Sequence, residues 1–463
     1  MIIVISKFFA KYVAPQCLCA RRSQNPLASQ VIMVIIMCRS KVGGFVGHLL
    51  MVESWVGSMS TLLPAGIRDR GHTFSFLTRD LSHYLRGKPS THPLLGAANV
   101  LTAETNDETA LVAYVRRLHE VLAFDGVLSS CDYYLPTVAA IAADLGLPGP
   151  ARDAVDAACR KDRTRALCQA AGVPGPAFAV SEDWGELARA ATEIGYPLVV
   201  KPVDLCGGMY VRRVDDEQQL RAAVERIAGF PVNARGQIRA PQILVEECLA
   251  GPEFSVETVT VRGHTTVVGV TDKRLTGTPA FIEAGHMFPA TLTDDEQAAV
   301  SAVARDAITA LGLDDTVAHT EIKRTADGPR LIEVNPRPAG NRITELVRRV
   351  TGIDLAAVHA EVAAGDTPDL TPRPTGTGSA AIAFAVADRA GVLTAISGDE
   401  RWDDDPRVVE HTLAEPGTEV RIATDNNTYL GHVMVVDEQP GAAGDLARDL
   451  IDKLTVDVAR VAS

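Results

Sequence analysis

The sequence has no excess of basic residues and no cysteines spaced for metal or disulfide chemistry. Its 45 Lys and Arg residues are outnumbered by 58 Asp and Glu residues, which leaves a formal net charge of −13. Binding to a nucleic-acid backbone needs a basic surface, so we expect no nucleic-acid partner. The eight cysteines are scattered, and without closely spaced couples they match neither a zinc site nor a disulfide framework. We therefore expect a cytoplasmic protein.

Long hydrophobic runs are also missing. The run VIMVIIM near the N-terminus is far shorter than the roughly 20 residues needed to span a bilayer, so we expect no membrane partner. The first 52 residues contain six Lys or Arg residues and no Asp or Glu. This composition leaves two interpretations open, a targeting peptide and a stretch upstream of the folded protein. We predict that residues 1–47 form an extension outside the fold.

From residue 48 onward, apolar segments alternate with helical ones. This alternation predicts an α/β domain with a parallel sheet over residues 48–150. Ligands of such sheets collect at the carboxyl ends of the strands, here residues 53–58 and 129–132. Because no GxGxxG opens the first helix, we predict no dinucleotide site.

Two further domains are expected, since 463 residues with 46% hydrophobic composition suit about three. After residue 196, strands separated by short turns indicate an antiparallel sheet, and we assign residues 151–365 to this second domain. The Pro- and Gly-rich stretch GDTPDLTPRPTGTGS predicts a linker. Residues 366–463 then form a C-terminal lobe with a hairpin, EVRIATDNNTYLGHVMVV, and a closing helix over residues 442–458.

One predicted hairpin, HTEIKRTADGPRLIEVNPR, places acidic side chains together. Its turn reads as a three-residue loop centred on Asp327. This register sets Glu321 opposite Glu333 and Ile322 opposite Ile332, so that the isoleucines face the core and the acids share the other face. Like charges directly opposite each other repel. A positive group is therefore expected between the two acids.

A divalent cation is one candidate for that group. Two carboxylates and the amide oxygen of Asn335 are hard donors that suit Mg²⁺, which completes its coordination shell with water and phosphate oxygens. The alternative is a solvent-facing hairpin in which Lys323 relieves the repulsion. From these residues alone, both interpretations stay open.

Two other strand ends contain charged residues near flexible turns. Lys201 closes an apolar strand shortly before two glycines, where a backbone can approach a phosphate; a solvated lysine beside a turn is the alternative. The segment VEECLAGPEFSVE places Glu246 and Glu247 at one strand end and Glu253 at the start of the next. These acids can accept from a base amine or from ribose hydroxyls, or they are simply solvated.

Taken in order, Lys161, Lys201, VEECLAGPEFSVE, TEIKR and EVNPR resemble the ATP-grasp superfamily of carboxylate–amine ligases. Within it, TDKRLTGTPAFIEAGHMFPA followed by NPRPAGNRI is most similar to the L-amino-acid ligases that make dipeptides. The resemblance implies a multidomain α/β and α+β protein with the ATP-grasp fold. An N-terminal preATP-grasp domain, an ATP-grasp domain that clamps ATP between two subdomains, and a C-terminal β-rich lobe are its expected parts.

The resemblance also implies roles for individual residues. The nucleotide-binding set, two lysines for the phosphates and four residues for adenine and ribose, is Lys161, Lys201, Glu246, Glu247, Leu249 and Glu253. The magnesium ligands are Glu321, Glu333 and Asn335. The amino-acid pocket contains Glu283, His286, Gly340 and Asn341. The catalytic residues are Arg337, which meets the transferred phosphoryl group, together with Lys201 and His286.

The implied reaction joins amino acids, or an amino acid and another amine, through an acyl phosphate and releases ADP and phosphate. The implied cofactors are ATP and Mg²⁺, with two ions expected and Mn²⁺ as a substitute. The partners are small carboxylates and amines, and a homodimer is open because large ligases of this kind are often dimers. One departure is GGMYV, which puts Tyr210 where a second glycine is expected in the phosphate loop. Other acyl-phosphate enzymes, of biotin-carboxylase or carrier-protein type, and an inactive nucleotide-binding regulator are the alternatives.

Overall fold

The computed structural model describes residues 46–85, 94, 96–276, 279–426 and 428–460. All of them belong to the second of two units into which the chain divides, which runs from Phe45 to Ser463. The predicted extension over residues 1–47 lies outside the described residues except for Val46 and Gly47. Among the described residues, no helix combines the length and the apolar character that a membrane span requires.

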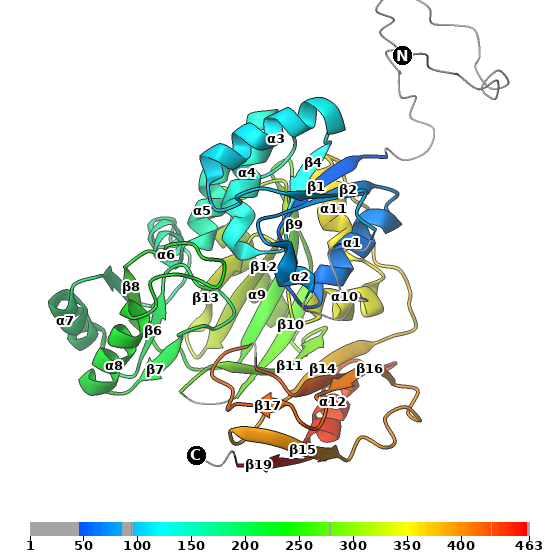
Figure 1. Cartoon of the computed structure of the whole chain (residues 1–463). Coiled ribbons are helices and arrows are strands. Elements are labelled where there is room, and N and C mark those ends of the chain that lie inside the picture. The colour runs from blue at the N-terminus through cyan, green and yellow to red at the C-terminus, as the bar shows by residue number, and fades with distance from the viewer. Residues whose placement is uncertain (1–45, 86–93, 95, 277–278, 427, 461–463) are drawn as a thin grey trace, which may run out of the picture. The chain divides into compact units, whose positions relative to one another are not determined.

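The N-terminal α/β domain contains a four-stranded parallel sheet, as predicted (Figure 1). In order across the sheet, its strands are β3 (Asn99–Thr102), β2 (Thr73–Thr78), β1 (His48–Val52) and β4 (Gly126–Leu128). Its helices are α1 (Met59–Asp69), α2 (Leu81–Leu85), α3 (Glu108–Leu122), the short 3₁₀ helix η2 (Asp132–Tyr134) and α4 (Leu135–Leu145). Because β1 and β4 are parallel neighbours, the loops that follow them emerge at the same edge of the sheet.

The two faces of this sheet are covered by different helices. Leu49 and Met51 of β1 belong to one hydrophobic cluster with α1 and with α11 (Leu355–Ala363). The alternate residues, Leu50 and Val52, belong to a second cluster with α3 and α4. The contact of α11 is close, since a Cβ atom added at Gly66 would lie 2.6 Å from the backbone nitrogen of Ala357. α11 lies within residues 151–365, the predicted second domain, and packs on the core of the first.

A small antiparallel sheet forms the first half of the second domain. Its strands, in order, are β5 (Phe178–Ser181), β8 (Ile243–Glu247), β6 (Leu198–Pro202) and β7 (Arg212–Val214). The helices α7 (Trp184–Ile194) and α8 (Glu217–Ala228) pack on it around Leu198, Val200 and Val245. We call residues 178–247 the small lobe. The helices α5 (Arg152–Cys159) and α6 (Lys161–Ala170) precede it.

An eight-stranded antiparallel sheet forms the centre of the described unit. Its strands, in order, are β13 (Gly328–Asn335), β12 (Thr316–Thr325), β9 (Glu253–Val261), β10 (His264–Thr276), β11 (Ile282–Phe288), β14 (Ser379–Ala385), β18 (Gly431–Asp437) and β16 (Val408–Leu413). The helix α9 (Asp294–Leu311) packs with α5 on one side, and α10 (Ile343–Thr351) packs with α11 on the other. The antiparallel strands predicted after residue 196 are confirmed, but they divide between this sheet and the small lobe.

The C-terminal lobe differs from its prediction in two places. The expected hairpin is wrong, because β17 (Glu419–Val420) pairs with β15 (Gly391–Ser397), whereas β18 pairs with β14 and β16 of the large sheet. The closing helix is shorter than predicted: α12 (Ala442–Asp452) is followed by β19 (Thr455–Ala459). Alternating β-branched residues in TVDVA favour a strand at that position. The large sheet therefore continues across the linker into this lobe.

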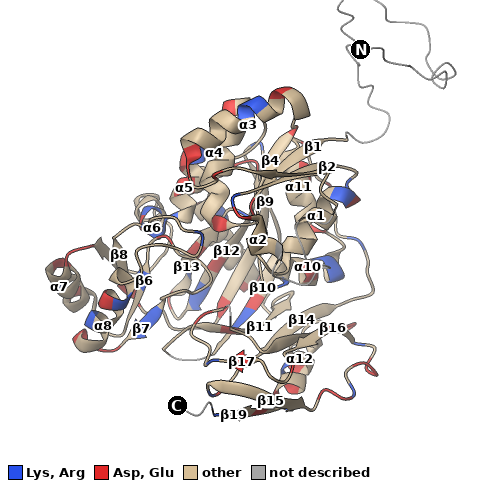
Figure 2. Ribbon diagram, viewed as in Figure 1, with Lys and Arg blue, Asp and Glu red and all other residues tan. Residues whose placement is uncertain are grey.

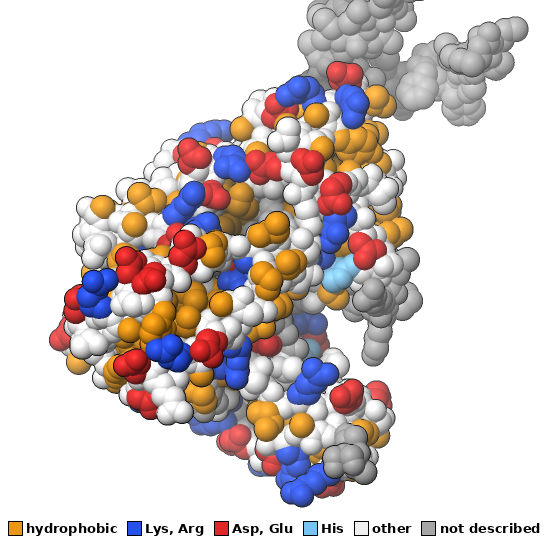
Figure 3. Space-filling view, turned by 60° about the vertical axis from the view of Figure 1, so that its left-hand side comes forward, with side chains coloured by type: hydrophobic (Ala, Val, Ile, Leu, Met, Phe, Trp, Pro, Cys, Tyr) orange, Lys and Arg blue, Asp and Glu red, His pale blue; other side chains and the backbone are white. Residues whose placement is uncertain are grey.

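Charged residues lie both on the surface and inside the fold. Figure 2 shows acidic and basic positions on strands of the large sheet near β10 and β12 as well as on the outer helices. On the face shown in Figure 3, side chains of both signs are interspersed. Several of the interior charges, among them Lys161, Lys201 and Lys273, line the cavity described next.

Candidate functional site

A cavity of about 490 Å³ lies where the three parts of the fold meet. The N-terminal domain contributes the loop after β1 and the residues after β4, including Trp55, Ser130 and Asp132. The small lobe contributes Lys201 at the end of β6 and the glycines that follow. The large sheet contributes the polar face of β9 to β13. Both loops predicted to approach a ligand in the first domain therefore line this cavity.

The hairpin β12–β13 sets the two predicted acids opposite each other. Glu321 pairs with Glu333 in the ladder, and both line the cavity. The turn, however, has two residues rather than three, since Thr325 pairs with Gly328. A β-bulge between Glu321 and Ile322 then restores the expected register of the acids. A bulge adds one residue to one strand and so changes which side chains are opposite each other.

The bulge makes one predicted pair wrong. Ile322 lies opposite Leu331, not Ile332. Ile322 and Leu331 are both buried in the core. Ile332 lines the cavity beside Glu333. Ile332 thus gives the cavity a hydrophobic wall next to its acids. In a regular hairpin without the bulge, this side chain would face the core.

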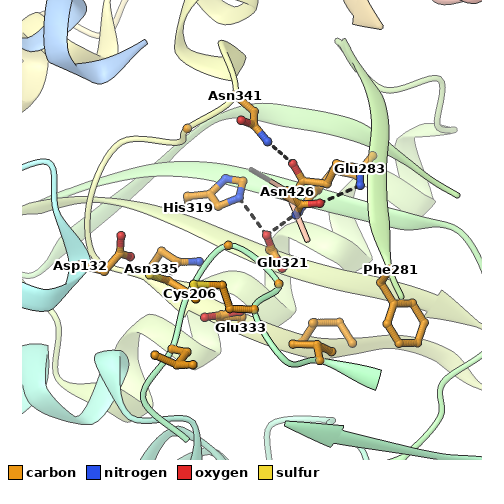
Figure 4. A pocket seen from close by; sticks show the side chains of 18 of the residues that line it. Asp132, Cys206, Phe281, Glu283, His319, Glu321, Glu333, Asn335, Asn341 and Asn426 are labelled. Atoms are coloured by element: carbon orange, nitrogen blue, oxygen red, sulfur yellow. Dashed lines mark hydrogen bonds and ion pairs between the residues drawn. The ribbon is translucent and has the colours of Figure 1, made fainter. Parts of the chain in front are cut away.

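Lysines from other elements balance the opposed acids. Lys161 Nζ lies 2.9 Å from a carboxylate oxygen of Glu333. Lys273 forms an ion pair with Glu321, and His319 Nε2 lies 3.3 Å from the same carboxylate (Figure 4). Burial alone would raise the pKa of Glu321, but Lys273 and His319 outweigh it and hold this pKa below its usual value. Glu321 is therefore held as a carboxylate.

The same acids and Asn335 form a donor set that fits Mg²⁺. Asn335 is buried, lies two residues beyond Glu333 on β13 and also lines the cavity. The described residues contain no cluster of three or more His, Cys, Asp or Glu side chains able to hold a metal by themselves. Mg²⁺ is commonly held by one or two carboxylates together with phosphate oxygens and water. Two carboxylates and one amide oxygen meet that requirement.

Lys201, which was predicted to close an apolar strand, is buried near the end of β6 and forms an ion pair with Glu246. Lys201 contacts one carboxylate oxygen of Glu246, and Arg165 Nε donates to the other at 2.9 Å. Burial would raise the pKa of Glu246, but Arg165 and Lys201 outweigh it and lower this pKa. Because both oxygens of Glu246 are engaged, its carboxylate neutralises two cations instead of standing open to a base amine. Glu246 also lines the cavity, and its place in a nucleotide site stays a prediction.

The other residues predicted for a nucleotide also line the cavity. Glu247 pairs with Arg330 at 3.0 Å and is the most exposed of them. Leu249 is buried and apolar. Glu253 lies 3.4 Å from Lys323 and 3.4 Å from Lys273. Lys323 therefore neutralises Glu253 and does not relieve the repulsion between the hairpin acids.

Glu283, on β11, collects three donors and shares one of them, Lys273, with Glu321. Lys273 Nζ lies 3.1 Å from Glu283, His286 Nε2 lies 3.2 Å from it, and Asn341 Nδ2 donates to the same carboxylate. Burial would raise the pKa of Glu283, but Lys273 and His286 outweigh it and keep this pKa well below its usual value. Gly340 and Asn341 line the cavity beside it. The predicted amino-acid pocket is thus gathered around one buried carboxylate.

His286 is the exception. Its side chain is fully buried, and it packs edge-on against Phe384 with 5.7 Å between ring centroids. It is not part of the cavity wall. The role of His286 in binding a substrate group stays a prediction, and in this structure its Nε2 contacts the carboxylate of Glu283.

Arg337 is held by an acid from the N-terminal domain. Its Nε lies 2.9 Å from Asp132, and Asp132 also accepts from Trp55 Nε1 at 2.7 Å. Burial would lower the pKa of Arg337, but Asp132 outweighs it and raises this pKa. Both residues line the cavity. A permanently charged guanidinium is thereby fixed at the junction of two domains.

Comparisons with known proteins agree with this arrangement. Residues 194–345 match a family model described as ATP-grasp domain, and residues 71–149 match the ATP-grasp N-terminal domain. Residues 383–459 match L-amino acid ligase C-terminal domain 2. The chain therefore contains an ATP-grasp domain preceded by an ATP-grasp N-terminal domain.

Relatives of this ATP-grasp protein include an uncharacterized protein, y4rH, of Sinorhizobium fredii, which is 29% identical over 88% of this chain and 85% of its own length. Mouse carnosine synthase 1 is 28% identical over 77% of the chain, and the alanine–anticapsin ligase of Bacillus subtilis is 26% identical over 55%. The chain spans only 44% and 57%, respectively, of these two enzymes.

Solved structures show the same fold. The L-amino acid ligase from Bacillus licheniformis superimposes with a TM-score of 0.75 at 23% identity, covering 89% of this chain and 99% of that one. A biotin carboxylase domain from Hydrogenobacter thermophilus gives 0.66 at 16% identity, covering 90% and 91%. The predicted ATP-grasp architecture is confirmed.

The glycine-rich loop of this ATP-grasp protein keeps its glycines on the cavity. Gly207 and Gly208 line it and have positive φ angles of 66° and 71°, a conformation that favours glycine. Tyr210 also has a positive φ, 60°, but its ring stacks on Phe230 with 4.9 Å between centroids. Tyr210 packs with the core of the small lobe and does not line the cavity.

Several residues of the site were missed or left open by the sequence. Lys273 contacts three acids at once, Glu253, Glu283 and Glu321. His319 is held from behind by the fully buried Glu257, 3.0 Å from its Nδ1. Burial alone would lower the pKa of His319, but Glu257 outweighs it and raises this pKa to about 9. A signal existed for His319, which lies two residues before Glu321 on β12, whereas β10, the strand of Lys273, contains no predicted site residue.

Proposed function

We propose that this protein is an ATP-dependent carboxylate–amine ligase that joins an amino acid to a second amine and releases ADP and phosphate. The observation that carries the proposal is the cavity that unites an opposed pair of acids, Glu321 and Glu333, with Arg337 and a third carboxylate, Glu283. A site of this composition suits phosphoryl transfer beside the opposed acids and an ammonium group beside Glu283. The similarity to L-amino acid ligases and to carnosine synthase supports it.

The residues present fit ATP and magnesium. Glu321, Glu333 and Asn335 would hold Mg²⁺, of which we expect two ions with Mn²⁺ as a substitute. Lys161 and Lys201 would meet the phosphates, while the backbone from Glu246 to Leu249 would border the adenine and Glu253 would accept from the ribose. When bound, ATP supplies the phosphoryl group that converts an unreactive carboxylate into an acyl donor, and Mg²⁺ neutralises the phosphate charge.

Arg337 has the central role in this mechanism. Phosphoryl transfer forms a bond between phosphorus and a carboxylate oxygen of the substrate and breaks the bond to the oxygen that leaves with ADP. Arg337 holds the charge that spreads over the phosphoryl oxygens during this step, and Asp132 keeps its guanidinium oriented. The acceptor amine then attacks the acyl phosphate. A C–N bond forms, the C–O bond to phosphate breaks, and the nitrogen releases a proton.

The other residues bind the amino acid and exclude water from the cavity. Glu283 would receive the ammonium group of an amino acid, which would replace one of its present donors. Trp55 and Ile332 give the cavity apolar walls, and the glycine loop lies over the phosphate end, where closure would keep water from the acyl phosphate. Binding of the ammonium group and formation of the apolar walls need only side chains that line the cavity.

Bicarbonate as the acid is the second candidate, since a biotin carboxylase domain shares the fold. Glu283 disfavours it, because a buried carboxylate repels an anion that has no ammonium group. The same neighbour is described as a dimer, which supports a homodimer for this protein, and we propose a cytoplasmic location.

The test is the formation of ADP with the full chain, Mg²⁺ and ATP, measured against panels of amino acids singly and in pairs and against bicarbonate. We expect ADP only with amino acids, together with an amide product detected by mass spectrometry. ADP that depends on bicarbonate would replace the proposal with the second candidate. Tight ATP binding without turnover on any panel would leave a nucleotide-binding regulator.

A further inference from the structure

A segment of the C-terminal lobe reaches the catalytic cavity. Asn426, in the connection between β17 and β18, lines the cavity together with the glycine loop and Glu283. In Figure 4 it lies beside Glu283, to which a dashed line joins it. None of the roles derived so far uses this lobe. Its function must therefore come from what Asn426 and the residues before it contact.

On one side, the segment contacts the small lobe. The backbone nitrogen of Asn426 donates to Gly207 O at 3.2 Å, and Arg212 Nη1 donates to Thr424 O at 3.0 Å. A Cβ atom added at Gly208 would lie 3.5 Å from Asn426 Nδ2. The segment therefore sits directly on the loop that borders the phosphate end of the cavity. Any movement of that loop changes these contacts.

On the other side, the side chain of Asn426 contacts the amino-acid end. The backbone N–H of Glu283 donates to Asn426 Oδ1 at 3.0 Å. Because an N–H group can only donate, this contact fixes which end of the amide is the oxygen. Asn426 is thus joined to the phosphate loop through its backbone and to the acid of the amino-acid pocket through its side chain.

We propose that Asn426 is a positioning residue that couples the glycine loop to the amino-acid pocket. Nucleotide that draws the loop onto its phosphates fixes Gly207, Gly207 fixes Asn426, and Asn426 fixes the backbone of Glu283. The C-terminal lobe is then a working part of the ligation site. Both links rest on the proposed function, one on its amino-acid pocket and the other on its nucleotide site.

Hydrogen–deuterium exchange of the full chain tests the nucleotide link. With Mg²⁺ and the non-hydrolysable analogue AMP-PNP, we expect slower exchange both in peptides covering residues 205–213 and in those covering residues 282–288. Asn426→Ala keeps the backbone bond to Gly207 O but loses the acceptor of the Glu283 N–H, so the first set stays protected, while protection of the second falls by about fivefold, the value of one hydrogen bond. Equal protection of residues 282–288 in both proteins, or none in the wild type, would overturn the proposal.

Two further variants separate the coupling from a loss of folding. Thr418→Ala removes a side-chain hydrogen bond to Glu415 O in the same lobe, away from the cavity, and should leave both protection patterns as in the wild type. Asn426→Asp retains the oxygen that accepts from Glu283 and should keep most of the protection. If Thr418→Ala loses protection as Asn426→Ala does, the effect is a general one on the lobe and the proposal is wrong.

Calorimetry tests the amino-acid link. In the wild type, AMP-PNP with Mg²⁺ should tighten the binding of an amino acid that supports turnover, and in Asn426→Ala this tightening should shrink by about fivefold while nucleotide affinity changes less than twofold. An unchanged tightening would overturn the coupling. A wild type that binds nucleotide but no amino acid would refute the proposed function, and the exchange experiment would still decide the role of Asn426.

Discussion

The contact between Asp132 and Arg337 joins the N-terminal domain to the reacting end of the cavity, and its removal should slow catalysis without unfolding the chain. The side chains are 11% and 13% exposed, respectively, and the nearest atoms are 2.9 Å apart. Asp132 accepts two hydrogen bonds, one from Arg337 Nε and one from Trp55 Nε1. Asn in its place has only one oxygen, so Asp132→Asn must turn an amino group toward one of the two donors.

The magnitude follows from the loss of charge. At an effective dielectric constant of about 20, unit charges 2.9 Å apart attract by roughly 6 kcal/mol. Part of this is retained by the Asn dipole, and breaking a buried pair usually costs about 3–5 kcal/mol. If about 3 kcal/mol of that appears in the barrier because Arg337 loses its orientation, kcat falls by roughly 150-fold.

The assay is ADP formation with a saturating amino-acid substrate, accompanied by AMP-PNP binding and a thermal melt. We expect AMP-PNP binding within about threefold of the wild type, since Arg337 acts on the transferred group. Trp55→Phe is the matched control, because it removes only the second donor to Asp132 and should cost no more than about tenfold, near one hydrogen bond to a charged group. A kcat of Asp132→Asn within threefold of the wild type, or an equal loss in Trp55→Phe, would refute this reasoning.

Three further predictions concern other titratable side chains of the protein. Glu333→Gln should abolish turnover and weaken Mn²⁺ binding with the fold intact, and turnover within about tenfold of the wild type, 1.4 kcal/mol in barrier, would contradict the metal role. Lys273→Met should lower the free energy of unfolding by about 3 kcal/mol in denaturant titrations, because it leaves three buried acids without their common cation; a loss below about 1 kcal/mol would contradict it. Burial lowers the pKa of His359 from 6.5 to about 4, so the unfolded chain takes up more protons between these values and stability falls as the pH falls, by about 3 kcal/mol in all. His359→Leu should remove that part of the pH dependence, and an unchanged slope between pH 6.5 and 4 would refute it.

Local patterns predicted much of the fold. The parallel sheet of the first domain could be predicted because each strand is followed by its own helix. The sheet that each later strand joins could not be predicted in the same way. β17 and β18 follow each other in the sequence, yet they pair with other strands and belong to different sheets. The position of α11 on the first domain depends on small residues such as Gly66 and Ala357 that allow close approach. No local pattern indicates which distant helix will use them.

The site was predicted where side chains share a strand face and missed where they meet across domains. The alternation of β13 placed Glu333 and Asn335 together, and the ordered motifs gave their chemistry. The turn length was wrong by one residue, and a bulge compensated for it, so the opposed acids were right while the pairing of Ile322 was not. The contacts of Arg337 with Asp132 and of Asn426 with Glu283 join segments far apart in the sequence. Only the folded chain reveals them.

The charges of the cavity also explain why the fold should survive the loss of a metal ligand. Glu321 and Glu333 face each other, and such a pair would destabilise a hairpin if nothing neutralised it. Lys161 and Lys273 neutralise them from two other elements of the protein itself. Lys161 Nζ also donates to Leu205 O at 2.5 Å, so it keeps a partner when Glu333 becomes an amide. Removing the charge of Glu333 therefore removes a repulsion together with an attraction, and its effect should fall on ion binding and turnover far more than on stability.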